Sequence, residues 1–135
     1  AMKTDTVTEI FKKINSFKQH KRRVEYMKDN WCTPVTTVIM GNFNDRINLK
    51  MPEGTPPYTP KKDAVHNEDV YKQAQLLVDF SQHQWAREKM FIDMIETLPP
   101  EDAELFIAMK DKKVTDKYPN ITLDLVKEVW PQLLK

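Results

Sequence analysis

The amino-acid sequence predicts an all-α fold: a compact single-domain bundle of about six or seven short helices spanning residues 1–135. Apolar side chains recur at steps of three and four residues along most of the chain, which is the spacing of one face of an amphipathic helix. Four prolines fall within residues 52–60, and their missing N–H donors and fixed φ exclude helix and central strand there. We therefore expect an irregular proline-rich loop near residues 42–66. Apolar residues occur in every segment, and 135 residues suit one domain with one core.

The first helix is predicted to begin at Thr6, because Thr6 and Glu9 have the spacing of a capping box. The apolar residues that follow share one helix face; they are Val7, Ile10, Phe11, Ile14 and Phe17. The pattern weakens at Asn15 and Ser16, and a second helix is expected over about residues 18–29.

The stretch after Thr33 and Pro34 contains conflicting signals. Residues 35–40 are rich in β-branched side chains, which is typical of a strand. A Thr-Pro start and Gly41 as a stop are typical of a short helix, because proline is tolerated at the first helical position. We interpret this stretch as a helix. The apolar and polar residues of 47–51 alternate, which fits a short extended piece inside the loop.

The C-terminal half is predicted to contain further helices. Asn67 is a suitable cap and is followed by two acids, which favour the positive end of a helix. A break is expected near residues 81–82, and the longest apolar pattern then runs from Trp85 to Leu98. The last two helices are predicted to begin at Pro100 and at the cap Thr122, with the final one ending near Pro131.

Composition excludes several classes of function. There are 21 Lys and Arg against 20 Asp and Glu, a net charge of +1, which excludes a uniformly basic nucleic-acid coat and an acidic DNA mimic. One cysteine excludes an intrachain disulfide framework and a thiolate-rich zinc site. Two glycines exclude a glycine-rich phosphate loop. No apolar run approaches the roughly 18 residues of a membrane span, so we expect no membrane as a partner.

The near-neutral total conceals an uneven distribution of charge. Residues 1–30 carry a net +4, residues 31–66 a net +1 and residues 67–135 a net −4. The basic N-terminal region therefore predicts a nucleic-acid-binding surface for DNA or RNA, with Tyr26 or Trp31 as a stacking partner. Its candidate residues are Lys18, Lys21, Arg22, Arg23 and Lys28. The default alternative is a solvated face that pairs with the acidic region 67–135.

Two further features are candidates for binding another protein. The segment of Pro56, Pro57 and Tyr58 is either a preordered ligand for a groove on a partner or a loop folded back over the core. We favour folding back, because Met51 and Tyr58 are apolar anchors at either end. Trp85 belongs to an apolar stripe on one predicted helix, together with Met90, Phe91, Met94 and Ile95. The default role of this stripe is core packing. A partner-binding groove or a homodimer interface would use the same residues.

We predict no catalytic residue, no metal ligand set and no cofactor. The three histidines lack ligand spacing, and a lone cysteine such as Cys32 is usually a small buried hydrophobe. Glu101, Asp102 and Glu104 lie at a predicted helix N-terminus, where acids are expected in any case. A small metal-dependent enzyme using these acids is the third hypothesis.

Two stretches of the chain resemble signature sequences of a known family. They are MPEGTPPY at residues 51–58 and DAELFIAMKDKK at residues 102–113, and LVKEVWP at residues 125–131 is similar to the closing helix. The family is an uncharacterised group of small proteins of large contractile-tailed phages, including cyanophages, and the resemblance spans residues 30–134. It implies a viral origin and a role in the cytoplasm of an infected bacterial host cell. It implies no reaction.

The leading hypothesis is therefore a non-enzymatic phage accessory protein that binds another protein. The partner is expected to be a viral replication or transcription component or a host factor. Nucleic-acid binding by the basic region is the alternative.

Overall fold

The computed structural model describes residues 6–135, in which eight α-helices and two short 3₁₀ helices form and no β-strand does. The all-α fold class is confirmed. The first five residues of the basic region 1–30 lie outside the described residues. The elements are α1 Val7–Ser16, α2 His20–Asp29, α3 Thr33–Phe43, α4 Glu68–Lys72, η1 Ala74–Val78, α5 Gln84–Glu96, α6 Pro100–Lys110, α7 Val114–Lys117, α8 Leu123–Val129 and η2 Pro131–Leu134.

Local signals begin most of these helices where the sequence predicts. The Thr6 hydroxyl accepts a hydrogen bond from the Glu9 amide at 3.2 Å, and the Glu9 carboxylate accepts one from the Thr6 amide at 3.3 Å. This reciprocal pair is the expected capping box of α1. Pro34 and Pro100 stand in the first turns of α3 and α6. The Thr122 hydroxyl caps α8 by accepting from the Leu125 amide at 3.2 Å.

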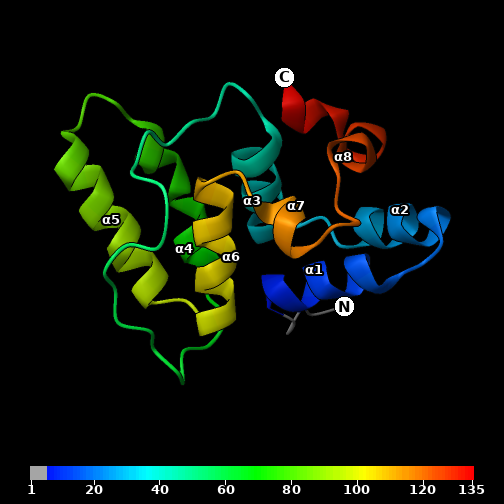
Figure 1. Ribbon diagram of the computed structural model, residues 1–135, viewed down its shortest axis with the longest axis horizontal. Coiled ribbons are helices and arrows are strands. Elements are labelled where there is room, and N and C mark those ends of the chain that lie inside the picture. The colour runs from blue at the N-terminus through cyan, green and yellow to red at the C-terminus, as the bar shows by residue number, and fades with distance from the viewer. Residues whose placement is uncertain (1–5) are drawn as a thin grey trace.

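Helix α3 forms in spite of its β-branched residues. Val35, Val38 and Ile39 are fully buried, so packing on more than one side of the helix overrides their preference for a strand. Helix α6 lies against α3 in the middle of the molecule. Helices α4 and α5 with η1 lie on one side of this pair, and α1, α2 and α8 lie on the other (Figure 1).

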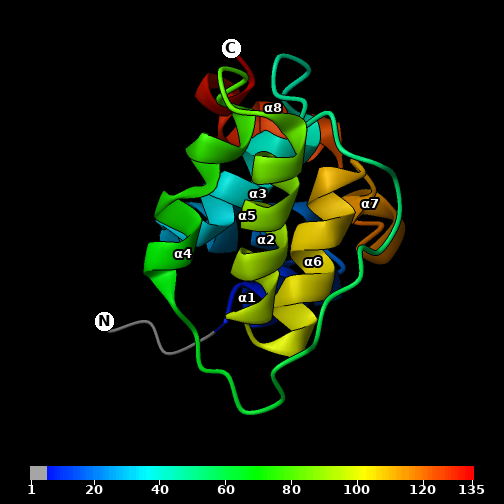
Figure 2. The same cartoon turned by 90° about the vertical axis from the view of Figure 1, so that its left-hand side faces the viewer.

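The proline-rich segment folds back over the helices. In Figure 2 it runs along the outer side of α6 and round the end of the α5–α6 pair to α4. The Gly54 amide donates to the Asp111 carboxylate at 3.0 Å, and the Thr59 amide donates to the Glu96 carboxylate at 2.8 Å. These bonds tie the segment to the end of α6 and to α5.

Two local expectations are wrong. The extended piece at 47–51 does not form, because Lys50 has a left-handed φ of 54° and its amide donates to the Asn48 side chain at 2.9 Å in a turn. The helix that begins after Asn67 is shorter than expected, because it ends at Lys72. The 3₁₀ helix η1 follows it where the α-helix was expected to continue. None of the helices formed by residues 6–135 combines the length and the apolar composition that a bilayer-spanning segment requires.

Gly41 sets how closely α3 approaches α6. A Cβ at this position would lie 2.5 Å from the Sδ atom of Met109, which is buried at the contact. No L-residue with a side chain fits there unless Met109 moves. The absence of a side chain at Gly41 therefore outweighs the low helix propensity of glycine.

We predict that Gly41→Ala lowers the free energy of unfolding by about 1–3 kcal/mol, because the added methyl group overpacks the α3–α6 contact. In a Met109→Ala background the clash is absent, and the same change is expected to stabilise by up to about 1 kcal/mol through helix propensity. Urea unfolding of the four variants of this cycle measures both effects. An equal effect of Gly41→Ala in both backgrounds would show that Met109 does not set the contact.

Candidate functional site

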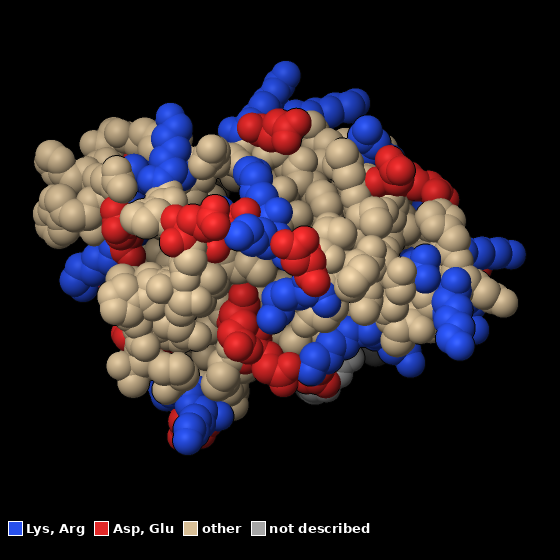
Figure 3. Space-filling view, viewed as in Figure 1, with Lys and Arg blue, Asp and Glu red and all other residues tan. Residues whose placement is uncertain are grey.

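An exposed apolar cluster occupies the end of the molecule at which α5 begins. We call it the aromatic tip, and it consists of Leu76, Phe80 and Trp85. Their exposed fractions are 40%, 49% and 68%. In Figure 3 this end of the molecule, at the upper left, is mostly uncharged surface. The default expectation of core packing is wrong for Trp85, whereas Phe91, Met94 and Ile95 of the same stripe are buried.

Hydrogen bonds hold the backbone of the aromatic tip in one conformation. The Asp79 carboxylate accepts from the amide and the hydroxyl of Ser81, at 3.2 and 2.6 Å. The Gln82 side chain donates to the Leu76 carbonyl at 3.2 Å, which closes the turn between η1 and α5. The His83 ring stacks on Trp85 with the planes inclined by 15°. Phe80 therefore stands on an ordered turn, between Leu76 in η1 and Trp85 at the start of α5.

Two cations contact the ring of Phe80. The Lys50 ammonium and the Arg87 guanidinium each lie 4.7 Å from the ring centroid. Arg87 is 5% exposed, and it donates to the carbonyls of Leu49 and Leu77 at 2.7 and 3.3 Å. Arg87 thus links α5 to the segment before the prolines and to η1. Sequence reasoning missed Phe80 and Arg87, although the turn residues around Phe80 signal an exposed position.

An apolar cavity of about 500 Å³ lies behind η1. Its lining comes from α3, α4, η1, the segment 47–49 and Met109, and Lys72 is its one charged residue. Helix η1 contributes to both features: Ala74, Gln75, Leu77 and Val78 line the cavity, and Leu76 is exposed on the aromatic tip.

The predicted protein-binding residues of the loop are less accessible than Trp85. Tyr58 is half-buried against the core, and burial raises the pKa of its hydroxyl. Pro56 is also half-buried, and Pro57 is exposed. The segment is therefore not a free ligand-like strand. The folded-back arrangement that we favoured is the one that the structure shows.

The predicted nucleic-acid-binding residues lie on α2 and the link before it. Arg23 is turned inward, and its guanidinium donates to the carbonyls of Phe17 and Lys18 at 2.8 and 3.5 Å. Arg22 lies over the Phe17 ring, 4.9 Å from its centroid. Lys18, Lys21 and Lys28 are exposed, and within residues 6–135 none of them forms an ion pair.

The default expectation is that the basic N-terminal region pairs with the acidic region 67–135, and it holds for few residues. Lys12 pairs with Glu101, and His20 lies 2.6 Å from the Glu128 carboxylate. The proposed stacking partners are also engaged. Tyr26 packs edge-on against Phe17 at 5.5 Å, and the half-exposed Trp31 packs edge-on against Trp130 at 5.3 Å.

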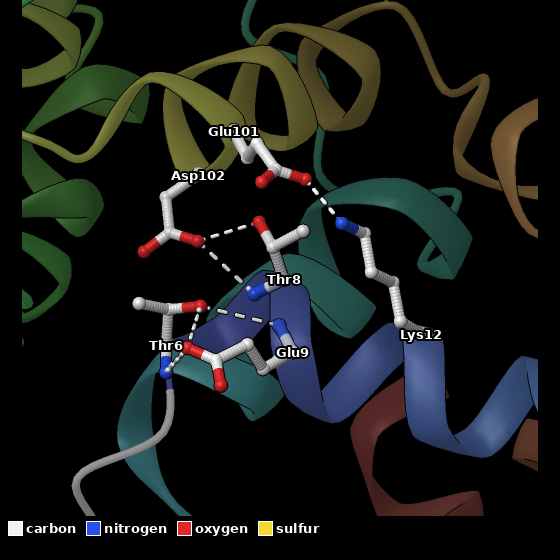
Figure 4. A network of polar contacts seen from close by, with 6 residues as sticks. All are labelled: Thr6, Thr8, Glu9, Lys12, Glu101 and Asp102. Atoms are coloured by element: carbon white, nitrogen blue, oxygen red, sulfur yellow. Dashed lines mark hydrogen bonds and ion pairs between the residues drawn. The ribbon is translucent and has the colours of Figure 1, made fainter. Parts of the chain in front are cut away.

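The three acids at the start of α6 point in different directions. Figure 4 shows Glu101 reaching Lys12 and Asp102 reaching Thr8 of α1. Glu104 borders a hollow beside Tyr58. Within the part of the chain that the structure describes, no group of three His, Cys, Asp or Glu residues is arranged to hold a metal ion. The geometry therefore gives no support to the metal-dependent enzyme.

Asp102 is fully buried and joins α6 to α1. Its Oδ1 atom accepts from the amide of Thr8 at 3.0 Å and from the Thr8 hydroxyl at 2.5 Å. Its Oδ2 atom and the hydroxyl of Tyr71 are buried without a hydrogen-bond partner among residues 6–135. Burial raises the pKa of Asp102, and the bonds from Thr8 oppose that shift only in part. Burial and the charge of Asp102 also raise the pKa of Tyr71.

A family described as of unknown function (DUF6433) matches residues 10–116. The chain belongs to this family. The match includes the two stretches 51–58 and 102–113 and also most of α1 and all of α2, and it stops before α8. The searches of curated proteins and of solved structures each gave no match. Membership in the family therefore assigns no activity to the chain. The surface of the molecule is the remaining guide to its function.

We predict that the stability contributed by Asp102 falls as the pH rises. Because the folded-state pKa is above the unfolded value, the folded protein holds the proton longer, and unfolding becomes easier from about pH 4 upward through the folded pKa. Asp102→Asn keeps an oxygen acceptor for Thr8 and cannot ionise. The unfolding free energy of Asp102→Asn relative to the wild type is therefore expected to increase between pH 4 and pH 7, as measured by urea unfolding.

The control for this prediction is Asp102→Ala. It leaves the amide and hydroxyl of Thr8 without their acceptor and is expected to cost about 1–3 kcal/mol. Parallel pH profiles for the wild type and Asp102→Asn would contradict the assignment.

Proposed function

We propose that this family member is a non-enzymatic accessory protein of a contractile-tailed phage, which acts by binding another protein through the aromatic tip. The observation that supports the proposal is the exposure of Leu76, Phe80 and Trp85 around the hydrogen-bonded turn that joins η1 to α5. Scattered single apolar residues are normal on a protein surface, but here three of them fall within ten residues of the chain.

The chemistry of the aromatic tip suits a protein partner. Tryptophan contributes more binding energy at protein interfaces than most residues, because it buries a large rigid area. The hydrogen-bonded turn and the two cations on Phe80 order these side chains before a partner arrives. Less conformational entropy is then lost on association. The His83 ring on Trp85 and the Gln82 amide add polar groups at the rim.

The phage context of the proposal comes from the resemblance at residues 51–58 and 102–113. It favours a viral replication or transcription component or a host factor as the partner, in the cytoplasm of an infected bacterial cell. A second copy of the chain is the other candidate occupant of the tip, and it would give a homodimer.

We predict that Trp85→Ala lowers the amount of its partner captured from infected-cell lysate at least tenfold, which is a loss of about 1.4 kcal/mol or more. Phe80→Ala is expected to act in the same direction. The matched control is Val65→Ala, because Val65 is 77% exposed and belongs to the segment before α4 and not to the aromatic tip. Quantitative mass spectrometry of the three captures gives the comparison.

Trp85 packs only on the ring of His83 among the described aromatic contacts, so its removal is not expected to unfold the domain. Circular dichroism checks this. If Trp85→Ala and Phe80→Ala retain every captured protein at the amount seen with Val65→Ala, the tip is not the binding surface. A monomer-to-dimer change abolished by Trp85→Ala would instead identify a second copy as the partner.

A further inference from the structure

The end of the molecule opposite the aromatic tip carries a group of exposed cations. We call it the basic end, and it lies on the last turn of α1, the following link and α2: Lys13, Lys18, Lys21, Arg22 and Lys28. Figure 1 places α2 and the start of α5 at opposite ends of the longest axis. Figure 3 shows Lys and Arg side chains gathered over α2 at the right-hand end.

Lys13 and Lys28 stand in the last turns of α1 and α2, where cations suit the helix dipole, but helix stability does not account for Lys21 and Arg22. The first turn of α2 contains His20, Lys21 and Arg22 and no acid, and Gln19 provides no side-chain cap. The N-terminal end of a helix carries partial positive charge and is stabilised by anions, so basic residues there are unfavourable for the helix. A negatively charged ligand would offset the positive charge of these side chains and the partial positive charge at the start of the helix.

The cations of the basic end are available to such a ligand. None of the five forms an ion pair within residues 6–135. Arg23, which is inward, and His20, which pairs with Glu128, are not part of the surface. The Phe17 ring fixes two members of the group, with the Lys13 ammonium 5.5 Å and the Arg22 guanidinium 4.9 Å from its centroid.

From this arrangement we infer that the basic end binds the phosphate backbone of duplex DNA, without recognition of sequence. Several unpaired cations spread over two helices match a row of phosphates better than a single small anion. A single strand needs free aromatic faces on which its bases stack. Here Lys13 and Arg22 lie over the Phe17 ring, and the half-exposed Trp31 already packs edge-on against Trp130. A duplex requires only the cations, so it is the nucleic acid that this surface fits.

The test measures binding of the full chain to a fluorescent 20-base-pair duplex by anisotropy, from about 25 to 200 mM salt. The affinity of the wild type is expected to fall steeply with salt, because each neutralised phosphate releases counterions. Lys21→Glu/Arg22→Glu is expected to reduce the affinity at least tenfold and the slope of log K against log salt by about two. Acids in the first turn suit a helix, so α2 is expected to stay folded, which circular dichroism checks.

The matched control is Lys61→Glu/Lys62→Glu, which makes the same change in net charge on the exposed proline-rich loop. It is expected to bind DNA nearly as the wild type does. Lys18→Gln/Lys28→Gln, which disturbs no recorded ion pair, provides a second variant and is expected to weaken binding severalfold.

Three results would overturn the inference. The first is no duplex binding at the lowest salt, and the second is an equal loss of affinity in Lys61→Glu/Lys62→Glu. The third is tighter binding to single-stranded DNA or to RNA of the same length. The inference is independent of the proposed protein partner, since Trp85→Ala is expected to bind the duplex normally.

Discussion

The close contact between α3 and α6 is the constraint on which the rest of the structure depends. Gly41 allows the backbone of α3 to meet the side chain of Met109 directly, so only the side chain of α6 separates the two helices at this point. The pair fills the middle of the molecule, and other helices pack on both of its sides. The α4–α5 unit covers one side and the α1–α2–α8 unit covers the other. The aromatic tip and the basic end are therefore held far apart by a rigid centre.

Buried polar groups fix the two outer units on this centre. Asp102 of α6 holds the first turn of α1 through Thr8, and Arg87 of α5 holds the carbonyls of Leu49 and Leu77. Within the part of the chain that the structure describes, Asp102 Oδ2 and Arg87 Nε have no hydrogen-bond partner, so both groups still carry part of their desolvation cost. Such links contribute little net stability, but they disfavour other packings in which the same groups would be buried with no partner at all.

These same residues explain what the sequence does and does not predict. Helix starts at Thr6, Pro34, Pro100 and Thr122 are predictable because the capping and proline signals are local. The buried face of α5 instead runs through Arg87, Phe91, Met94 and Ile95, with Arg87 in the place of an apolar residue. A hydrophobicity pattern counts arginine as polar, so it places Arg87 outside the core. It assigns Trp85 to the core instead. Asp102 is hidden from sequence for another reason, since its partner Thr8 lies 94 positions away.

The distribution of charge adds a reason why the two surfaces would act separately. Residues 67–135, which contain the aromatic tip, carry a net −4, whereas residues 1–30 carry a net +4. A polyanion is therefore attracted to the exposed cations of the α2 end, so that the molecule orients itself before contact. The aromatic tip lies at the other end of the longest axis, so it stays free for a protein partner while the basic end is occupied. A chain of near-zero total charge can combine both kinds of surface because the basic end and the aromatic tip lie at opposite ends of one core.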